Sequence, residues 1–103
     1  MLINIILLEP LLLLVIQTIC MINKNTIITG DNSGRIRQYQ KNGDNLIFIY
    51  ENEKAHNLPI NSLIKLSNNH FASCSEDSTI KIWQKWIIRL NNNYINWFNN
   101  III

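Results

Sequence analysis

The stretch from Ala55 to Gln84 constrains the fold of this chain most strongly. It contains three short apolar segments: Ile60–Leu66, His70–Cys74 and Thr79–Gln84. Two polar connectors separate them, Ser67–Asn69 and Ser75–Ser78. Segments of this length that are bounded by Asn, Ser and Asp are typical of antiparallel strands joined by tight turns. The last segment is rich in β-branched and aromatic residues, which favour a strand. The stretch therefore predicts consecutive strands of one antiparallel sheet.

Particular residues at fixed spacings in this stretch resemble one WD repeat, the unit of a WD-type β-propeller blade. The matching residues are Ala55-His56, Ile60–Leu63, Phe71–Ser75, Asp77 and Thr79–Gln84. Two positions depart from the family pattern, because Ala55 stands in place of a Gly and Gln84 in place of the Asp that follows the Trp. The resemblance covers about thirty residues and implies a four-stranded blade.

An internal repeat extends the pattern toward the N-terminus. At an offset of 44 residues, Ile16–Ile19 aligns with Ile60–Leu63 and Arg35–Gln40 aligns with Thr79–Gln84. Residue class agrees without a gap over about twenty-five positions, and the offset suits a four-stranded blade of ~40–45 residues. The repeat predicts four strands of a first unit: Val15–Ile22, Thr26–Gly30, Arg35–Gln40 and Leu46–Tyr50.

The predicted fold class is therefore all-β, with two antiparallel four-stranded blades of an incomplete WD-type β-propeller. The expected organisation is an apolar N-terminal segment, a degenerate first blade, a second blade and an irregular Asn- and Ile-rich tail: residues 1–14, 15–50, 51–90 and 91–103. Residues 86–90 are the expected outer strand of the second blade.

The first 22 residues are strongly apolar and admit three interpretations. A signal peptide is disfavoured because no Lys or Arg precedes Lys24. A transmembrane helix has nearly the right length, but Glu9 and Pro10 interrupt it. The repeat favours a propeller strand for the second half. An apolar helix, with membrane association, stays open for residues 1–14, while a cytoplasmic location is the first expectation.

The resemblance also implies a buried hydrogen-bonded network of His56, Ser73, Asp77 and Trp83. A buried indole N–H needs an acceptor, which a hydroxyl supplies, and a carboxylate can satisfy the imidazole. Ser75 is the competing choice for the hydroxyl. At the corresponding positions the first unit has Leu12, Thr29, Ser33 and Tyr39, so only Thr29 keeps its residue type.

The sequence gives no signal for an enzyme, a cofactor or a metal that outranks a structural interpretation. Ser73 lacks the Gly-rich nucleophile elbow of a hydrolase. His56, His70, Cys74 and Asp77 lack zinc-ligand spacing, and Cys20 and Cys74 form no disulfide framework. Gly30 and Gly34 lack the Lys of a phosphate-binding loop. The net charge of +2 is scattered rather than clustered, which disfavours nucleic acid as a partner.

The expected function is a non-enzymatic scaffold that binds proteins or peptides, as the resemblance implies, and that forms part of a larger propeller. Two alternatives stay open: a membrane-associated protein anchored by its N-terminus, and a truncated relic copy without independent activity. Two blades leave apolar faces and sheet edges uncovered. Self-assembly that completes a propeller is therefore a further expectation.

Overall fold

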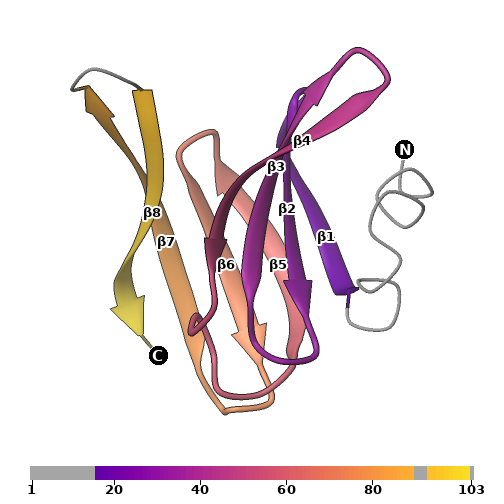
Figure 1. Cartoon of the computed structure of the whole chain (residues 1–103). Coiled ribbons are helices and arrows are strands. Elements are labelled where there is room, and N and C mark those ends of the chain that lie inside the picture. The colour runs from indigo at the N-terminus through magenta and orange to yellow at the C-terminus, as the bar shows by residue number, and fades with distance from the viewer. Residues whose placement is uncertain (1–15, 90–92, 103) are drawn as a thin grey trace.

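A computed structural model describes residues 16–89 and 93–102, and these residues form eight strands and no helix. The strands are β1 (Ile16–Asn23), β2 (Thr26–Asp31), β3 (Ile36–Asn42), β4 (Asn45–Asn52), β5 (Ile60–Ser67), β6 (His70–Ser75), β7 (Ile80–Arg89) and β8 (Asn93–Ile102). They form two antiparallel sheets with the orders β1-β2-β3-β4 and β5-β6-β7-β8. Figure 1 shows the two sheets, with β1 and β8 at opposite ends of the arrangement.

The two sheets repeat each other residue by residue over their first three strands. Ile27 pairs with Tyr39 in the first sheet, and 44 residues later Phe71 pairs with Trp83 in the second. Every described pair between β1 and β2, and between β2 and β3, recurs in the second sheet at this offset. The irregularities at both ends of the β1–β2 pairing recur as well. The structure therefore confirms the repeat in its strand register.

The turn that follows the second strand of each sheet repeats in the same way. The Asp31 amide donates to the carbonyl of Arg35, and the Ser75 amide donates to that of Thr79. Gly34 closes the first turn with a φ of 89°, and its counterpart Ser78 has a φ of 71°. Only glycine adopts this left-handed conformation at little cost. The second copy of the turn therefore carries local strain that the first avoids.

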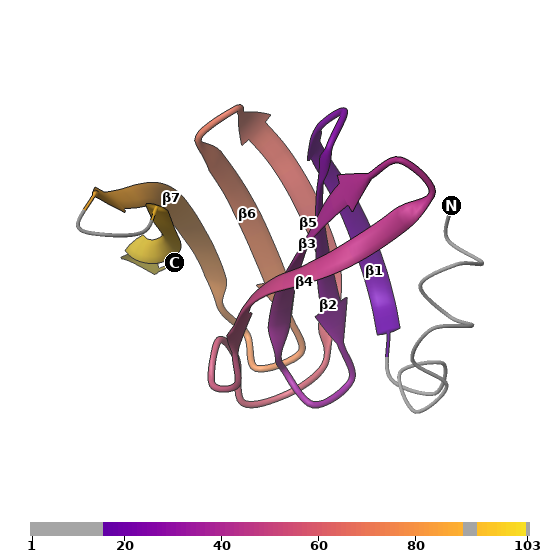
Figure 2. The same ribbon diagram turned by 45° about the horizontal axis from the view of Figure 1, so that its top comes forward.

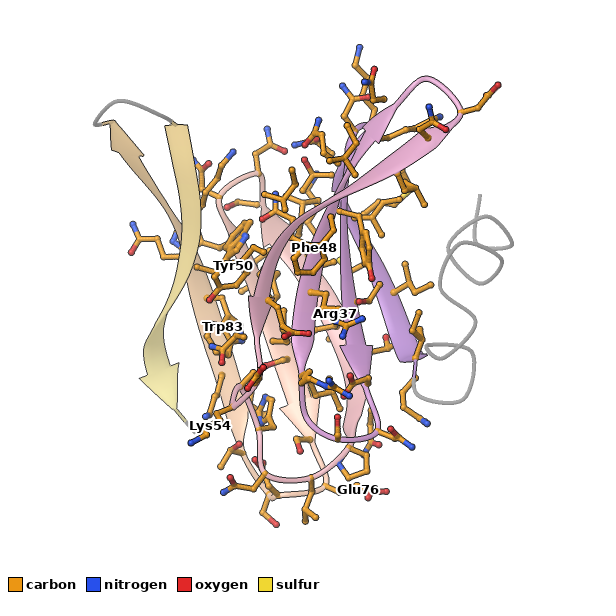
Figure 3. All side chains as sticks on the ribbon, in the orientation of Figure 1. Arg37, Phe48, Tyr50, Lys54, Glu76 and Trp83 are labelled. Carbon is orange, nitrogen blue, oxygen red and sulfur yellow. The ribbon has the colours of Figure 1, made fainter. Side chains whose placement is uncertain are left out.

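The main core lies between the two sheets. The first sheet contributes buried apolar side chains from β1, β2 and β3: Cys20, Ile22, Ile28 and Ile36. The second sheet contributes others from β5, β6, β7 and β8: Ile60, Leu63, Phe71, Trp83 and Trp97. Tyr50 of β4 packs against this cluster, and Figure 3 shows its side chain near that of Trp83. At Gly30 the sheets approach so closely that a Cβ atom would lie 2.8 Å from the Ile60 Cγ2.

Each sheet has a second face that points away from this core. On the first sheet it carries a smaller cluster in which Ile27 and Tyr39 are buried and Tyr39 meets the ring of Phe48 edge-on. On the second sheet we call it the outer face, and we define it by residues on β5, β6 and β7: Ile64, Leu66, Ala72, Ile80 and Ile82. Cross-strand partners share a face, and Ile64 pairs with Ala72, which pairs with Ile82. Ile64, Leu66 and Ile80 are exposed.

The all-β prediction with two antiparallel sheets is confirmed, and seven of the eight predicted strands each match a separate observed strand. The prediction of an irregular tail over 91–103 is wrong, because β8 covers Asn93–Ile102 and pairs with β7. The separate outer strand predicted at residues 86–90 is also wrong, since Trp86–Arg89 continue β7. The second unit therefore extends beyond residue 90 and the first reaches Asn52, rather than residue 50.

The N-terminal segment 1–14, with the apolar helix considered for it, lies outside the described residues. Within the part of the chain that is described, no helix has the length and apolar character needed to cross a membrane.

Candidate functional site

The candidate site is a cluster of polar side chains at the end of the second sheet where the β6–β7 turn lies. His56 comes from the connection between β4 and β5, Ser73 from β6, Asp77 from the β6–β7 turn and Trp83 from β7. The connection is held in place because the His56 amide donates to the Gly34 carbonyl over 2.9 Å. The β2–β3 turn of the first sheet therefore positions the histidine of the second. Figure 2 shows this turn beside the connection between β4 and β5.

The structure brings the four expected side chains together as one chain of hydrogen bonds. The Trp83 indole Nε1 donates to the Ser73 Oγ over 2.8 Å. The Ser73 Oγ lies 2.6 Å from the His56 Nε2, and the His56 Nδ1 lies 3.0 Å from the Asp77 Oδ2. His56, Ser73 and Trp83 are buried. Because the members come from four separate segments, the network can form only when the sheet and its preceding connection are in place.

The direction of each hydrogen bond follows from the partners. The Asp77 carboxylate can only accept, so the His56 Nδ1 carries the proton of the neutral imidazole and Nε2 is unprotonated. The Ser73 hydroxyl therefore donates to Nε2, while its oxygen accepts the Trp83 indole N–H. Burial lowers the pKa of His56 against the opposing effect of Asp77, which favours this neutral form. The network thus specifies one tautomer of the imidazole.

Asp77 accepts hydrogen bonds at both carboxylate oxygens. Its Oδ2 accepts hydrogen bonds from the His56 Nδ1 and from the Asn57 amide, the latter over 3.1 Å. Its Oδ1 accepts hydrogen bonds from the Thr79 amide, over 3.0 Å, and from the Thr79 hydroxyl. These donors hold the pKa of Asp77 well below its usual range, despite the opposing effect of burial. The carboxylate is therefore ionised at neutral pH with all its acceptor sites used.

Both pKa shifts make the folded state less stable in acid. The folded pKa of His56 lies below its unfolded value, so the unfolded chain binds the extra proton first as pH falls below about 6.5. The folded pKa of Asp77 is also lowered, so its contribution is present above about pH 4 and is lost as pH falls further. The free energy of unfolding should therefore decrease in both pH windows.

Ser75, the competing choice for the hydroxyl, has a different role. Its Oγ lies 3.0 and 2.9 Å from the carbonyl oxygens of Leu58 and Pro59, and it accepts the Asp77 amide. Thr79 is a partner that sequence reasoning missed, since its hydroxyl contacts both Asp77 and the His56 Nδ1. A hydroxyl residue two positions after a turn Asp is the signal that could have identified it.

The corresponding positions of the first sheet do not form this network. Thr29 and Tyr39 are buried, as Ser73 and Trp83 are. Ser33 instead donates through its amide and hydroxyl to Asp31, which also binds Arg35 in an ion pair. Leu12, at the position equivalent to His56, lies outside the described residues. The turn of the first sheet is thus organised around Asp31 rather than around a histidine.

A second buried polar contact, also missed by the sequence, joins the two sheets. The Trp97 indole Nε1 of β8 donates to the Gln38 Oε1 of β3 over 2.8 Å, and both side chains are buried. Trp97 also meets the Phe71 ring edge-on at 4.8 Å. The signal in the sequence was Gln38 itself, a polar residue at the position where the second unit has the apolar Ile82.

The burial of Ser73 limits the chemistry that the cluster can perform. The Ser73 hydroxyl lies in a side chain with no exposed surface, so a substrate cannot reach it while the sheet is intact. Among residues 16–89 and 93–102, no group of three His, Cys, Asp or Glu side chains could hold a metal ion. What the cluster does in this geometry is fix the His56 connection and the β6–β7 turn to the sheet.

Comparisons with known proteins add no further assignment: no protein-family model, no curated protein and no solved structure matches this chain.

Proposed function

We propose that this chain is a non-enzymatic protein-interaction module built from two WD-type propeller blades. The blade assignment is supported by the strand register that recurs at an offset of 44 residues. It is supported further by the His56–Ser73–Asp77–Trp83 network, which the resemblance to WD repeats implies for a complete blade.

The observation that carries the binding role is the outer face of the second sheet. Ile64, Leu66 and Ile80 on this face are 50%, 54% and 39% exposed. Contiguous apolar side chains in water are unfavourable and commonly mark an interaction surface. In the first sheet the equivalent positions are buried against the second sheet. The outer face therefore has the character of a surface that another protein covers.

A photo-crosslinking experiment in cells tests this role. A benzophenone amino acid placed at position 64 should yield protein adducts of defined mass, and Ile80→Lys in the same chain should reduce them. The matched control places the same amino acid at Lys24, which is exposed at the β1–β2 turn. Adducts at position 64 no more abundant than at position 24 would refute the binding role.

A further inference from the structure

The outer face of the second sheet has a buried counterpart within the chain itself. Under the 44-residue repeat, Ile64, Leu66, Ala72 and Ile80 correspond to four residues of the first sheet: Cys20, Ile22, Ile28 and Ile36. Those four are core residues, covered by the second sheet. A face with the same register and the same apolar character is therefore suited to being covered by another four-stranded sheet.

The first sheet of another copy is a poor candidate for that covering sheet. Within the chain the covering side carries Phe71 and Trp83, whose counterparts in the first sheet are Ile27 and Tyr39. Ile27 and Tyr39 are 0% and 3% exposed, so they are already buried in the single chain. A head-to-tail contact between copies would have to uncover them first, which would return apolar surface to water.

The outer face can instead meet the same face of another copy. The five residues that define it are aliphatic, and the other side chains that the register places on this face of β5, β6 and β7, Ser62, His70, Cys74 and Gln84, include no Asp, Glu, Lys or Arg. Two such faces can approach without placing like charges opposite each other. Two aligned sheets that bury their apolar faces against each other form a standard sheet-on-sheet packing. A contact between identical patches also closes on itself as a dimer.

We propose that a second copy of this chain covers the outer face, so that the protein forms a two-fold symmetric dimer through β5, β6 and β7. This proposal rests on the proposed interaction role and names the partner. In the dimer Ile64, Leu66 and Ile80 become buried. Because the contact is isologous, it closes at two copies and does not produce larger assemblies.

Sedimentation equilibrium of the purified full chain over a range of concentrations tests the proposal. Wild type should fit a monomer–dimer equilibrium. Ile64→Lys should weaken dimerisation at least about a hundredfold, because each interface would bury two unpaired ammonium groups. The matched control is Met21→Lys: Met21 is 46% exposed, close to the 50% of Ile64, but lies on the far face of the first sheet. This variant should dimerise as wild type does.

A mixing experiment separates the symmetric contact from a head-to-tail one. Excess Ile64→Lys chain added to dye-labelled wild type should form no mixed dimer, because the symmetric contact needs an intact outer face on both copies. A mixed dimer would overturn the proposal, since a head-to-tail contact needs only one such face. Circular dichroism of both Lys variants checks that each retains its sheets.

The remaining outcomes also decide the proposal. A wild-type monomer at all concentrations, or a ladder of larger assemblies, would overturn it. Loss of dimer in Met21→Lys would do the same, because that face is not part of the contact. If wild type is monomeric while position 64 crosslinks to a different protein in cells, the interaction role stands and the second copy is the wrong partner. If both experiments are negative, both proposals fail.

Discussion

Replacing Ser73 by Ala should be the most informative single change in this protein. The Ser73 hydroxyl accepts the Trp83 indole N–H at 2.8 Å and donates to the His56 Nε2 at 2.6 Å. Its removal leaves a buried donor and a buried acceptor without this partner. Each unsatisfied buried group costs about 1–3 kcal/mol, so Ser73→Ala should lower the free energy of unfolding by roughly 2–6 kcal/mol. This is a large share of the ~5–15 kcal/mol typical of a folded domain.

Urea denaturation followed by tryptophan fluorescence and circular dichroism, at one fixed protein concentration, measures this loss. The matched control is Ser67→Ala, which removes another serine hydroxyl from a histidine: the Ser67 Oγ lies 3.0 Å from the His70 Nδ1 at an exposed site. Because water can replace that contact, the control should change stability by less than about 0.5 kcal/mol. Equal effects of the two substitutions would refute the argument from burial.

A double-mutant cycle isolates the indole contact. Trp83→Phe removes the N–H together with some packing, and Ser73→Ala should cost less in that background because no indole donor is left unpaired. The coupling energy should be about 1–2 kcal/mol, within the range for contacting residues. A coupling energy near zero would show that the serine and the tryptophan act independently and would contradict the network.

Three further predictions concern the turns and pH. Gly34→Ala should lower the free energy of unfolding by at least about 3 kcal/mol, because its Cβ would lie 2.0 Å from the His56 carbonyl oxygen. The control Gly43→Ala shares the positive φ but has open space around it, so it should cost only about 1 kcal/mol. Equal losses of the two variants in urea denaturation would contradict the clash. Ser78→Gly should raise the melting temperature, by relieving about 0.5–1 kcal/mol of left-handed strain, and a decrease would refute the strain. Lowering the pH from 7.5 to 5.5 should reduce the free energy of unfolding, because the lowered pKa of His56 means that the unfolded chain binds the proton more readily than the folded one. An unchanged or higher free energy of unfolding would contradict the neutral, buried imidazole.

The strands that sequence reasoning located are those whose pattern is local. Short apolar segments bounded by Asn, Ser and Asp predicted β5 and β6, and the repeat carried the same pattern to β1 and β2. The four network residues came from the resemblance, and their types fit a donor–acceptor chain that a buried site must complete. These features could be predicted because the residues that form them either lie close in sequence or recur at one fixed offset.

The outer strand of the second sheet could not be predicted in this way. Asn93–Ile102 is rich in Asn, a residue that disfavours strands, and has no alternating pattern. It forms β8 because its backbone pairs along β7 and because Trp97 reaches the core and Gln38. These contacts join residues far apart in sequence, so tertiary pairing outweighs local propensity. The position of Asn91–Asn93 after an apolar run was the one available sign of a hairpin.

Hydrogen exchange of the Trp83 indole N–H, followed by NMR and assigned with Trp83→Phe, tests most directly whether His56, Ser73, Asp77 and Trp83 form one buried chain. This proton should exchange only when the second sheet opens, so its exchange rate should be lower in the stabilised Ser78→Gly variant than in wild type. Exchange at the rate of a solvent-exposed tryptophan in the folded protein would contradict the buried chain.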